Sequence, residues 1–181
     1  LLSYLFVRLS IMSEPINPGF EDLWRANEDY TKSFKYRDLT GRAARGLAIV
    51  TCMDSRINPL SVVGMKSGDA KILRNAGARV TQDVLRTLVL ATYLLGVDRI
   101  LVMPHTDCRM AQEDEEVIHA MIEEKHGVDT RSLEFNTVVD QRAALSQDLA
   151  RIRAFPLIPK NVIVSGGIYH VATGKIEPIE N

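Results

Sequence analysis

Two short clusters of reactive side chains stand apart in the sequence. The stretch TCMDSR, residues 51–56, places a thiol, a carboxylate and a guanidinium at Cys52, Asp54 and Arg56. The stretch HTDC, residues 105–108, adds an imidazole and a second thiol at His105 and Cys108. Two thiolates and one imidazole suit zinc, and three protein ligands leave the open position that is typical of a catalytic site. The residue types therefore predict a metal centre.

A zinc ion held in this way would generate a nucleophile from water. Bound zinc lowers the pKa of water from about 15.7 to near 7, so zinc-bound hydroxide is available at neutral pH. Asp54 lies two residues after Cys52 and is a candidate for a conditional fourth ligand. A bidentate pair with Arg56 is strong enough to compete for that carboxylate. We therefore expect the pairing with Arg56 to control whether Asp54 coordinates the metal or leaves its fourth position open. Strand alternation would place Cys52, Asp54 and Arg56 on one side of the chain.

The same residues allow interpretations without catalysis. Cys52 and Cys108 could be inert buried thiols or a disulfide, and Asp54 with Arg56 an ordinary ion pair at a strand end. A structural zinc site would be closed by a permanently coordinated Asp54. A redox or metal sensor would use the cysteines for regulation. Neither a structural site nor a sensor needs Arg56 beside Asp54.

The hydrophobic pattern predicts the elements that position these clusters. Alternating strands and helices favour an α/β fold with a mainly parallel central sheet of four strands flanked by helices, plus a C-terminal antiparallel edge strand. Gly166-Gly167 and Thr173-Gly174 are the predicted turning points of the C-terminal strands. Buried strands are expected at 46–52, 71–77 and 99–105, and helices at 20–34, 82–96 (capped by Thr81), 111–127 and 137–155.

This topology brings the two reactive clusters together. Open parallel sheets carry their ligand sites beyond the carboxyl ends of the strands, and each cluster follows a predicted strand. If the two strands are neighbours, Cys52, His105 and Cys108 converge. We expect Asp107, which precedes Cys108, to cap the following helix rather than to take part in chemistry.

Bulk composition limits the class of protein. A chain of 181 residues with 22 basic and 23 acidic side chains is long enough for one domain and gives no sign of a nucleic-acid or membrane partner. Two cysteines are too few for a disulfide scaffold, which favours the reducing cytoplasm. We expect an irregular lead over residues 1–19 and a single domain over 20–181. Because position 1 is not Met, residues 1–11 could be non-native, with Met12 as the true start.

Taken together, the motifs resemble those of the β-class carbonic anhydrases. C-x-D-x-R is followed about fifty residues later by H-x-x-C, and the segment GDAKILRNAG, residues 68–77, lies between them as in that family. The resemblance runs from about Phe20 to the C-terminal strands and is closest to the compact bacterial members. It implies a zinc lyase that hydrates carbon dioxide to bicarbonate, with one zinc per chain. It also implies a homodimer or homotetramer in which the N-terminal helix packs on a partner subunit.

The resemblance also implies residue roles. Cys52, His105 and Cys108 would be the zinc ligands, and Asp54 with Arg56 the dyad that controls the fourth position. Gly77 resembles the glycine that lets the backbone approach the pocket. The family usually has glycine directly after the second cysteine, whereas this chain has Arg109.

An inward Arg109 could narrow the pocket, bind bicarbonate or change the preference among linear triatomic substrates, whereas an outward one would be a surface residue at a helix start. Some close relatives hydrolyse carbonyl sulfide or carbon disulfide with the same metal site. A carbonyl sulfide or carbon disulfide hydrolase is therefore the alternative.

Overall fold

The computed structural model describes residues 19–179. The irregular lead expected over residues 1–19 lies outside these residues except for Gly19, and the expected non-native stretch 1–11 lies wholly outside them. The chain divides into two compact units, residues 1–38 and 39–181, and each is described by itself. The predicted extent of a single domain from residue 20 stays a prediction.

The first unit contributes helix α1 (Glu21–Lys32), which confirms the helix predicted over 20–34. Its aromatic side chains form pairs along the helix. The rings of Phe20 and Trp24 stack with centroids 6.2 Å apart, and those of Tyr30 and Phe34 meet edge to face at 5.6 Å. No residue of α1 is buried, so its own unit does not cover this apolar face.

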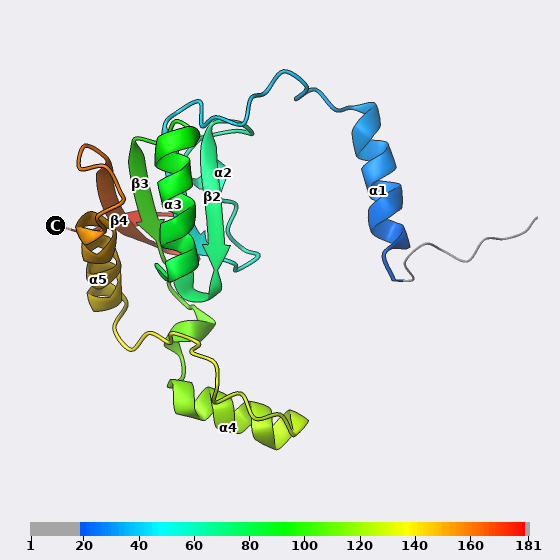
Figure 1. Ribbon diagram of the computed structural model, residues 1–181. Helices are drawn as coiled ribbons and strands as arrows, with labels where there is room; N and C mark the ends of the chain where they lie inside the picture. Colours follow the sequence, from blue (N-terminus) through cyan, green and yellow to red (C-terminus); the bar gives the residue numbers. More distant parts are fainter. Residues whose placement is uncertain (1–18, 180–181) are drawn as a thin grey trace, which may run out of the picture. The chain divides into compact units, whose positions relative to one another are not determined.

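The second unit is built on a five-stranded sheet in the order β2-β1-β3-β4-β5 (Figure 1). β2, β1, β3 and β4 pair in parallel, and β5 is antiparallel to β4. This arrangement confirms the predicted fold class. The strands are β1 (Leu47–Cys52), β2 (Ala70–Asn75), β3 (Arg99–Met103), β4 (Ile163–Tyr169) and β5 (Ile176–Pro178).

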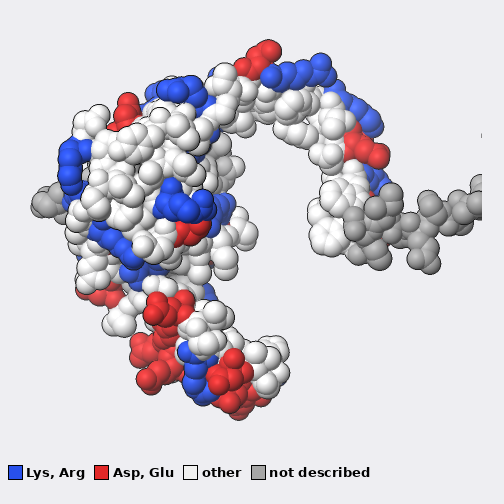
Figure 2. Space-filling model, in the orientation of Figure 1, with Lys and Arg blue, Asp and Glu red and all other residues white. Residues whose placement is uncertain are grey.

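α1 and α3 begin within one residue of the predicted positions, whereas α4 and α5 begin four residues later than predicted, and α2 was not predicted. The Thr81 hydroxyl accepts a hydrogen bond from the Val84 N–H at 3.4 Å and caps α3, as predicted. α4 starts with Glu115 and Glu116 where the helix dipole favours negative charge, and Figure 2 shows acidic side chains gathered over this helix. The helices are α2 (Pro59–Val62), α3 (Gln82–Leu94), α4 (Glu115–His126) and α5 (Gln141–Ala154), with the short 3₁₀ turns η1 (Ala76–Ala78) and η2 (Arg109–Ala111).

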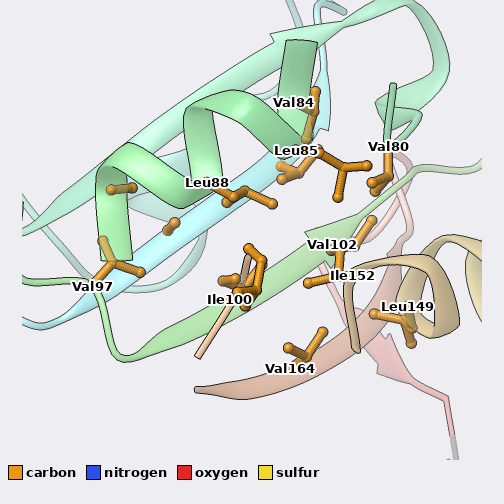
Figure 3. Packing of buried hydrophobic residues seen from close by; sticks show 14 of the residues in the cluster. Val80, Val84, Leu85, Leu88, Val97, Ile100, Val102, Leu149, Ile152 and Val164 are labelled. Atoms are coloured by element: carbon orange, nitrogen blue, oxygen red, sulfur yellow. The ribbon is translucent and has the colours of Figure 1, made fainter. Parts of the chain in front are cut away.

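All six residues of β1 are buried because both faces of the strand are covered. Ala48 and Val50 belong to the core formed with α3 and α5, whereas Leu47 and Ile49 belong to a second cluster on the opposite face. Figure 3 shows the first core, where Leu88 of α3 and Ile152 of α5 lie over strand residues of the sheet. The short strand is therefore a rigid support for the residue at its end.

The prediction that Gly166-Gly167 forms a turn was wrong, because both glycines lie inside β4. A Cβ at Gly166 would lie 3.0 Å from the side chains of Leu145 and Leu149, so α5 packs closely on the strand there. The turn before β5 instead includes Thr173 and Gly174, with φ +74° at the glycine. Within residues 19–179, no helix has both the length and the hydrophobicity needed to cross a bilayer.

Candidate metal centre

The predicted site residues meet at the carboxyl ends of two neighbouring strands. Cys52 is the last residue of β1, and β1 pairs directly with β3, with Thr51 opposite Met103. His105 and Cys108 lie in the loop that follows β3. The Thr51 hydroxyl donates a hydrogen bond to the Met103 carbonyl at 2.7 Å, which ties the two strand ends together. The predicted convergence of the two clusters is therefore confirmed.

Cys52, His105 and Cys108 form a compact buried triad of potential metal ligands. Their ligand atoms all lie within 4.8 Å of one another. The two Sγ atoms are 4.0 Å apart, which is far longer than a disulfide bond of about 2.05 Å. Two sulfurs at about 2.3 Å from one tetrahedral zinc would be about 3.8 Å apart. The triad thus has the spacing of a metal site and not of a cystine.

The ring of His105 is oriented for a ligand. Its Nδ1 lies 2.8 Å from the Thr106 carbonyl oxygen, and because a carbonyl can only accept, Nδ1 carries the proton. Nε2 is then left with a free lone pair. Among the buried side-chain atoms of residues 19–179, Nε2 is the one nitrogen or oxygen without a hydrogen-bond partner. A cation bound between Nε2 and the two sulfurs would satisfy it.

Burial, together with a smaller contribution from the neighbouring Cys52, raises the pKa of the Cys108 thiol to about 11. Without a cation, the buried sulfur is therefore held in its neutral form near pH 7. A divalent ion reverses this preference because it binds the thiolate directly. The three residues fit zinc in ligand type, spacing and burial.

Asp54 and Arg56 are paired at the edge of the triad, but strand alternation does not bring them there. β1 ends at Cys52, and the chain then turns so that the Arg56 N–H donates to Asp54 Oδ1 at 2.9 Å. The Arg56 side chain adds three contacts, from Nε to Oδ1 at 3.0 Å and to Oδ2 at 3.2 Å, and from Nη2 to Oδ2 at 2.7 Å. The predicted end of the strand at Cys52 is confirmed, but the expectation that strand alternation aligns residues 52, 54 and 56 was wrong.

The Asp54 carboxylate faces both Arg56 and the triad. Its Oδ2 lies 3.8 Å from His105 Nε2. Hydrogen bonds from Arg56 hold the pKa of the Asp54 carboxyl well below its usual range, so the group is ionised at neutral pH. An anionic oxygen is therefore held beside the unpartnered ring nitrogen.

Arg74 of β2 was not predicted as part of the site, yet it holds the loop that carries Asp54. Its guanidinium donates to the backbone carbonyls of Cys52 at 2.9 Å, Asp54 at 2.6 Å and Ile57 at 3.2 Å. Three carbonyls gathered on one cation fix the path of the chain just after the first cysteine. A charged residue within a predicted strand was the available sequence signal for this role.

The prediction that Asp107 caps a helix was also wrong. η2 begins after Cys108 without a side-chain cap, and the Asp107 carboxylate instead accepts a hydrogen bond from Arg56 Nη1 at 2.7 Å. Sequence spacing gave no sign of this contact, because the two residues come from loops after different strands.

Comparisons with known proteins agree with this geometry. Residues 47–176 match the carbonic anhydrase family. The chain belongs to the β-carbonic anhydrase family. It is 34% identical over 160 residues to β-carbonic anhydrase 1 of Mycobacterium tuberculosis, which covers 88% of this chain and 96% of that protein. It is also similar to the crystal structure of carbonic anhydrase from Streptococcus mutans, with a TM-score of 0.84 and 35% identity over 92% of this chain and 100% of the other.

Family membership does not separate the two substrate classes that the sequence left open. The chain is 32% identical over 156 residues to the carbon disulfide hydrolase of Saccharolobus solfataricus, covering 73% of this chain and 76% of that protein. Proteins named as carbonic anhydrase and as carbon disulfide hydrolase are therefore both relatives of this chain.

The two residues predicted for the pocket of this β-carbonic anhydrase family member have different surroundings. Gly77, at φ +77°, is buried in η1, and a Cβ there would lie 3.2 Å from Cβ of Met110. The Arg109 guanidinium lies 3.1 Å from Gln112 Oε1 and 3.6 Å from Glu113 Oε1. It also approaches the sulfur of Met121 at 3.9 Å, and its side chain is 55% exposed. These contacts direct Arg109 toward α4.

A largely apolar groove of about 480 Å³ includes residues that are adjacent in sequence to the two cysteines. Met53 and Arg109, which directly follow the two cysteines in sequence, line it together with Met110, Met121 and Phe135. The groove therefore reaches the immediate sequence neighbours of Cys52 and Cys108, although neither cysteine lines it.

Proposed function

We propose that this protein catalyses the reversible hydration of carbon dioxide to bicarbonate with one zinc ion per chain. The observation that carries the proposal is the buried Cys52, His105 and Cys108 triad with its unpartnered Nε2. An open catalytic site also needs a group that controls the fourth position, and Asp54 lies at that edge, paired with Arg56. A structural zinc site or a sensor would not need this pair.

Each residue has a separate task in the proposed reaction. Cys52, His105 and Cys108 would hold the zinc, which when bound supplies a Lewis acid able to lower the pKa of water to near 7. Asp54 is ionised and accepts a hydrogen bond from the reacting water. This hydrogen bond orients the lone pair of the water oxygen toward carbon dioxide. Arg56 keeps Asp54 in this accepting position by its two-point contact and prevents the carboxylate from filling the fourth position itself.

Hydrolysis of carbonyl sulfide or carbon disulfide with the same site is the second candidate function. Two observations favour it: the relatives named carbon disulfide hydrolase, and the apolar groove lined by Met53 and Arg109, the residues that follow the two cysteines. Both sulfur compounds are linear and apolar, and attack by the same nucleophile on their carbon requires no additional residue.

Parallel turnover assays on metal-quantified protein separate these functions. Stopped-flow hydration of carbon dioxide with a pH indicator, between about pH 6.5 and 9, should show turnover that increases with pH as the nucleophile forms. Carbonyl sulfide and carbon disulfide are assayed on the same preparation by release of hydrogen sulfide. Turnover of the sulfur compounds alone would establish the second function. Failure on all three substrates with zinc fully bound would favour a structural site.

The assembly proposed for this protein is a homodimer, or a homotetramer built from it, in which α1 packs on a second copy of the chain. The exposed aromatic face of α1 supports this proposal, because Phe20, Leu23, Trp24 and Tyr30 are each about half exposed. Side chains of this size rarely remain uncovered as a contiguous group on a monomeric protein.

A further inference from the structure

Arg56 has a second carboxylate partner besides Asp54. Its Nη1 donates to Asp107 Oδ2 at 2.7 Å, and its Nη2 donates to the Asp107 carbonyl oxygen at 3.0 Å. Asp54 is bound through Nε and Nη2 instead. The two aspartates therefore contact different edges of the planar guanidinium, and neither displaces the other.

These contacts join the two loops that carry the metal ligands. Arg56 and Asp54 belong to the loop after Cys52, whereas Asp107 lies between His105 and Cys108. The Arg56 side chain is 48% exposed, so packing alone does not fix it. Its position depends on the carboxylates at its two edges.

Asp107 is itself held in an unusual conformation. Its φ of +55° lies in the left-handed region, which costs a residue other than glycine about 1–3 kcal/mol unless surrounding contacts compensate. In this conformation both its carbonyl oxygen and its carboxylate contact Arg56. The other carboxylate oxygen accepts from Gln112 Nε2 at 3.2 Å, and Gln112 Oε1 accepts from Arg109 at 3.1 Å. Arg109, which stands where the family usually has glycine, is thus the outer end of a hydrogen-bonded chain that leads to Asp54.

We propose that Asp107 is a positioning residue that anchors Arg56 and thereby keeps Asp54 away from the fourth metal position. The inference rests on the proposed metal site and adds a third member to the pair that controls it. Without the Asp107 carboxylate, Arg56 loses the contact at one edge and its exposed side chain gains freedom. Asp54, already 3.8 Å from His105 Nε2, is then less firmly restrained from binding the metal.

The test measures access to the metal directly, independently of turnover. The zinc of the full chain is replaced by cobalt, and binding of azide is followed by the visible absorption of cobalt at one fixed pH. Asp107→Ala should weaken azide binding about threefold to tenfold, because Asp54 competes for the same position. Asp107→Asn keeps the size of the side chain, so it should also weaken azide binding, but by a smaller factor than Asp107→Ala. The matched control is Asp129→Ala, which removes an exposed aspartate that pairs with Arg131 at 3.1 Å outside the site.

A double variant distinguishes positioning from a general structural role. In an Asp54→Asn background the competing carboxylate is gone, so adding Asp107→Ala should change azide binding by less than about twofold. The inference is overturned if Asp107→Ala behaves like Asp129→Ala, or if its effect persists in the Asp54→Asn background. Failure of the wild-type chain to bind cobalt would overturn the metal site and this inference together, whereas cobalt binding without an Asp107 effect would overturn the inference alone.

Discussion

Substitution of the buried ligand Cys108 and of its neighbour Asp54 should have different effects: the first should remove the zinc, and the second should lower turnover. Cys108→Ser replaces a thiolate by a hydroxyl that remains protonated and binds zinc poorly, so the variant should lose its metal. Asp54→Asn keeps the three ligands, so it should retain zinc while turnover falls by about 10²-fold or more, since the amide cannot accept in the same way. Metal analysis after dialysis, combined with stopped-flow hydration, measures both effects.

The opposite pattern would contradict these roles. If Asp54→Asn lost the metal and Cys108→Ser kept it, Asp54 would be a committed ligand of a closed site. Far-ultraviolet circular dichroism of both variants checks that each one is folded, so that a loss of zinc is not simply a loss of structure.

At the residue scale, the sequence predicted which side chains meet but not how the loops hold them. The triad follows from residue chemistry, because two thiols and an imidazole after neighbouring parallel strands must share one edge of the sheet. Arg74 and Asp107 were missed or assigned another role because their contacts depend on the path of two irregular loops. Arg74 donates to the backbone carbonyl of Cys52, and the backbone carbonyl of Asp107 accepts from Arg56. Sequence spacing carries no information about the direction in which a backbone carbonyl points.

At the scale of elements, a substitution in the short turn η1 tests how tightly this turn packs against Met110. Gly77→Ala should destabilise the protein by about 2–3 kcal/mol, because alanine is strained at φ +77° and its Cβ would crowd Met110. Gly127→Ala is the matched control, since it has a similar φ of +67° and no neighbouring atom within 4 Å. Only the backbone penalty applies there, so a loss of about 1 kcal/mol is expected.

Urea unfolding with a common slope for all three proteins gives the comparison. Equal losses for the two variants would mean that the contact with Met110 contributes nothing, and the close packing inferred at Gly77 would then be wrong.

The strands were easier to predict than the turns. Leu47–Cys52 is a continuous apolar run because both of its faces are covered, and such a run is readable without any partner. Gly166 and Gly167 gave the opposite result. Glycine marks both turns and close approaches of packed elements, and only the position of Leu145 and Leu149 on α5 shows which of these applies.

At the scale of the whole molecule, alternation of strands and helices was sufficient to predict the parallel sheet and its antiparallel edge. The sheet order β2-β1-β3-β4-β5 places β1 and β3 side by side, and this adjacency is what assembles the triad. The assembly of subunits is a different matter. A helix with an apolar face needs a covering surface, but its sequence does not say whether that surface belongs to its own chain.

Helix α1 gives a direct test of the proposed assembly. Trp24 is 52% exposed and stacks on Phe20, so it stands within the face that a second copy would cover. Trp24→Glu places a charge in that contact and should shift the protein toward monomer, raising the dissociation constant by about 10²-fold or more. Sedimentation velocity over a range of protein concentrations measures this shift.

Arg25→Glu is the matched control because it changes the charge by a larger amount at the neighbouring position, about 100° further around the helix. It should leave the sedimentation behaviour close to that of the unaltered protein, since the apolar face is intact. A wild-type chain that sediments as a monomer at all concentrations would contradict the assembly. So would a dissociation caused equally by both substitutions, because the effect would then follow from charge on α1 rather than from its aromatic face.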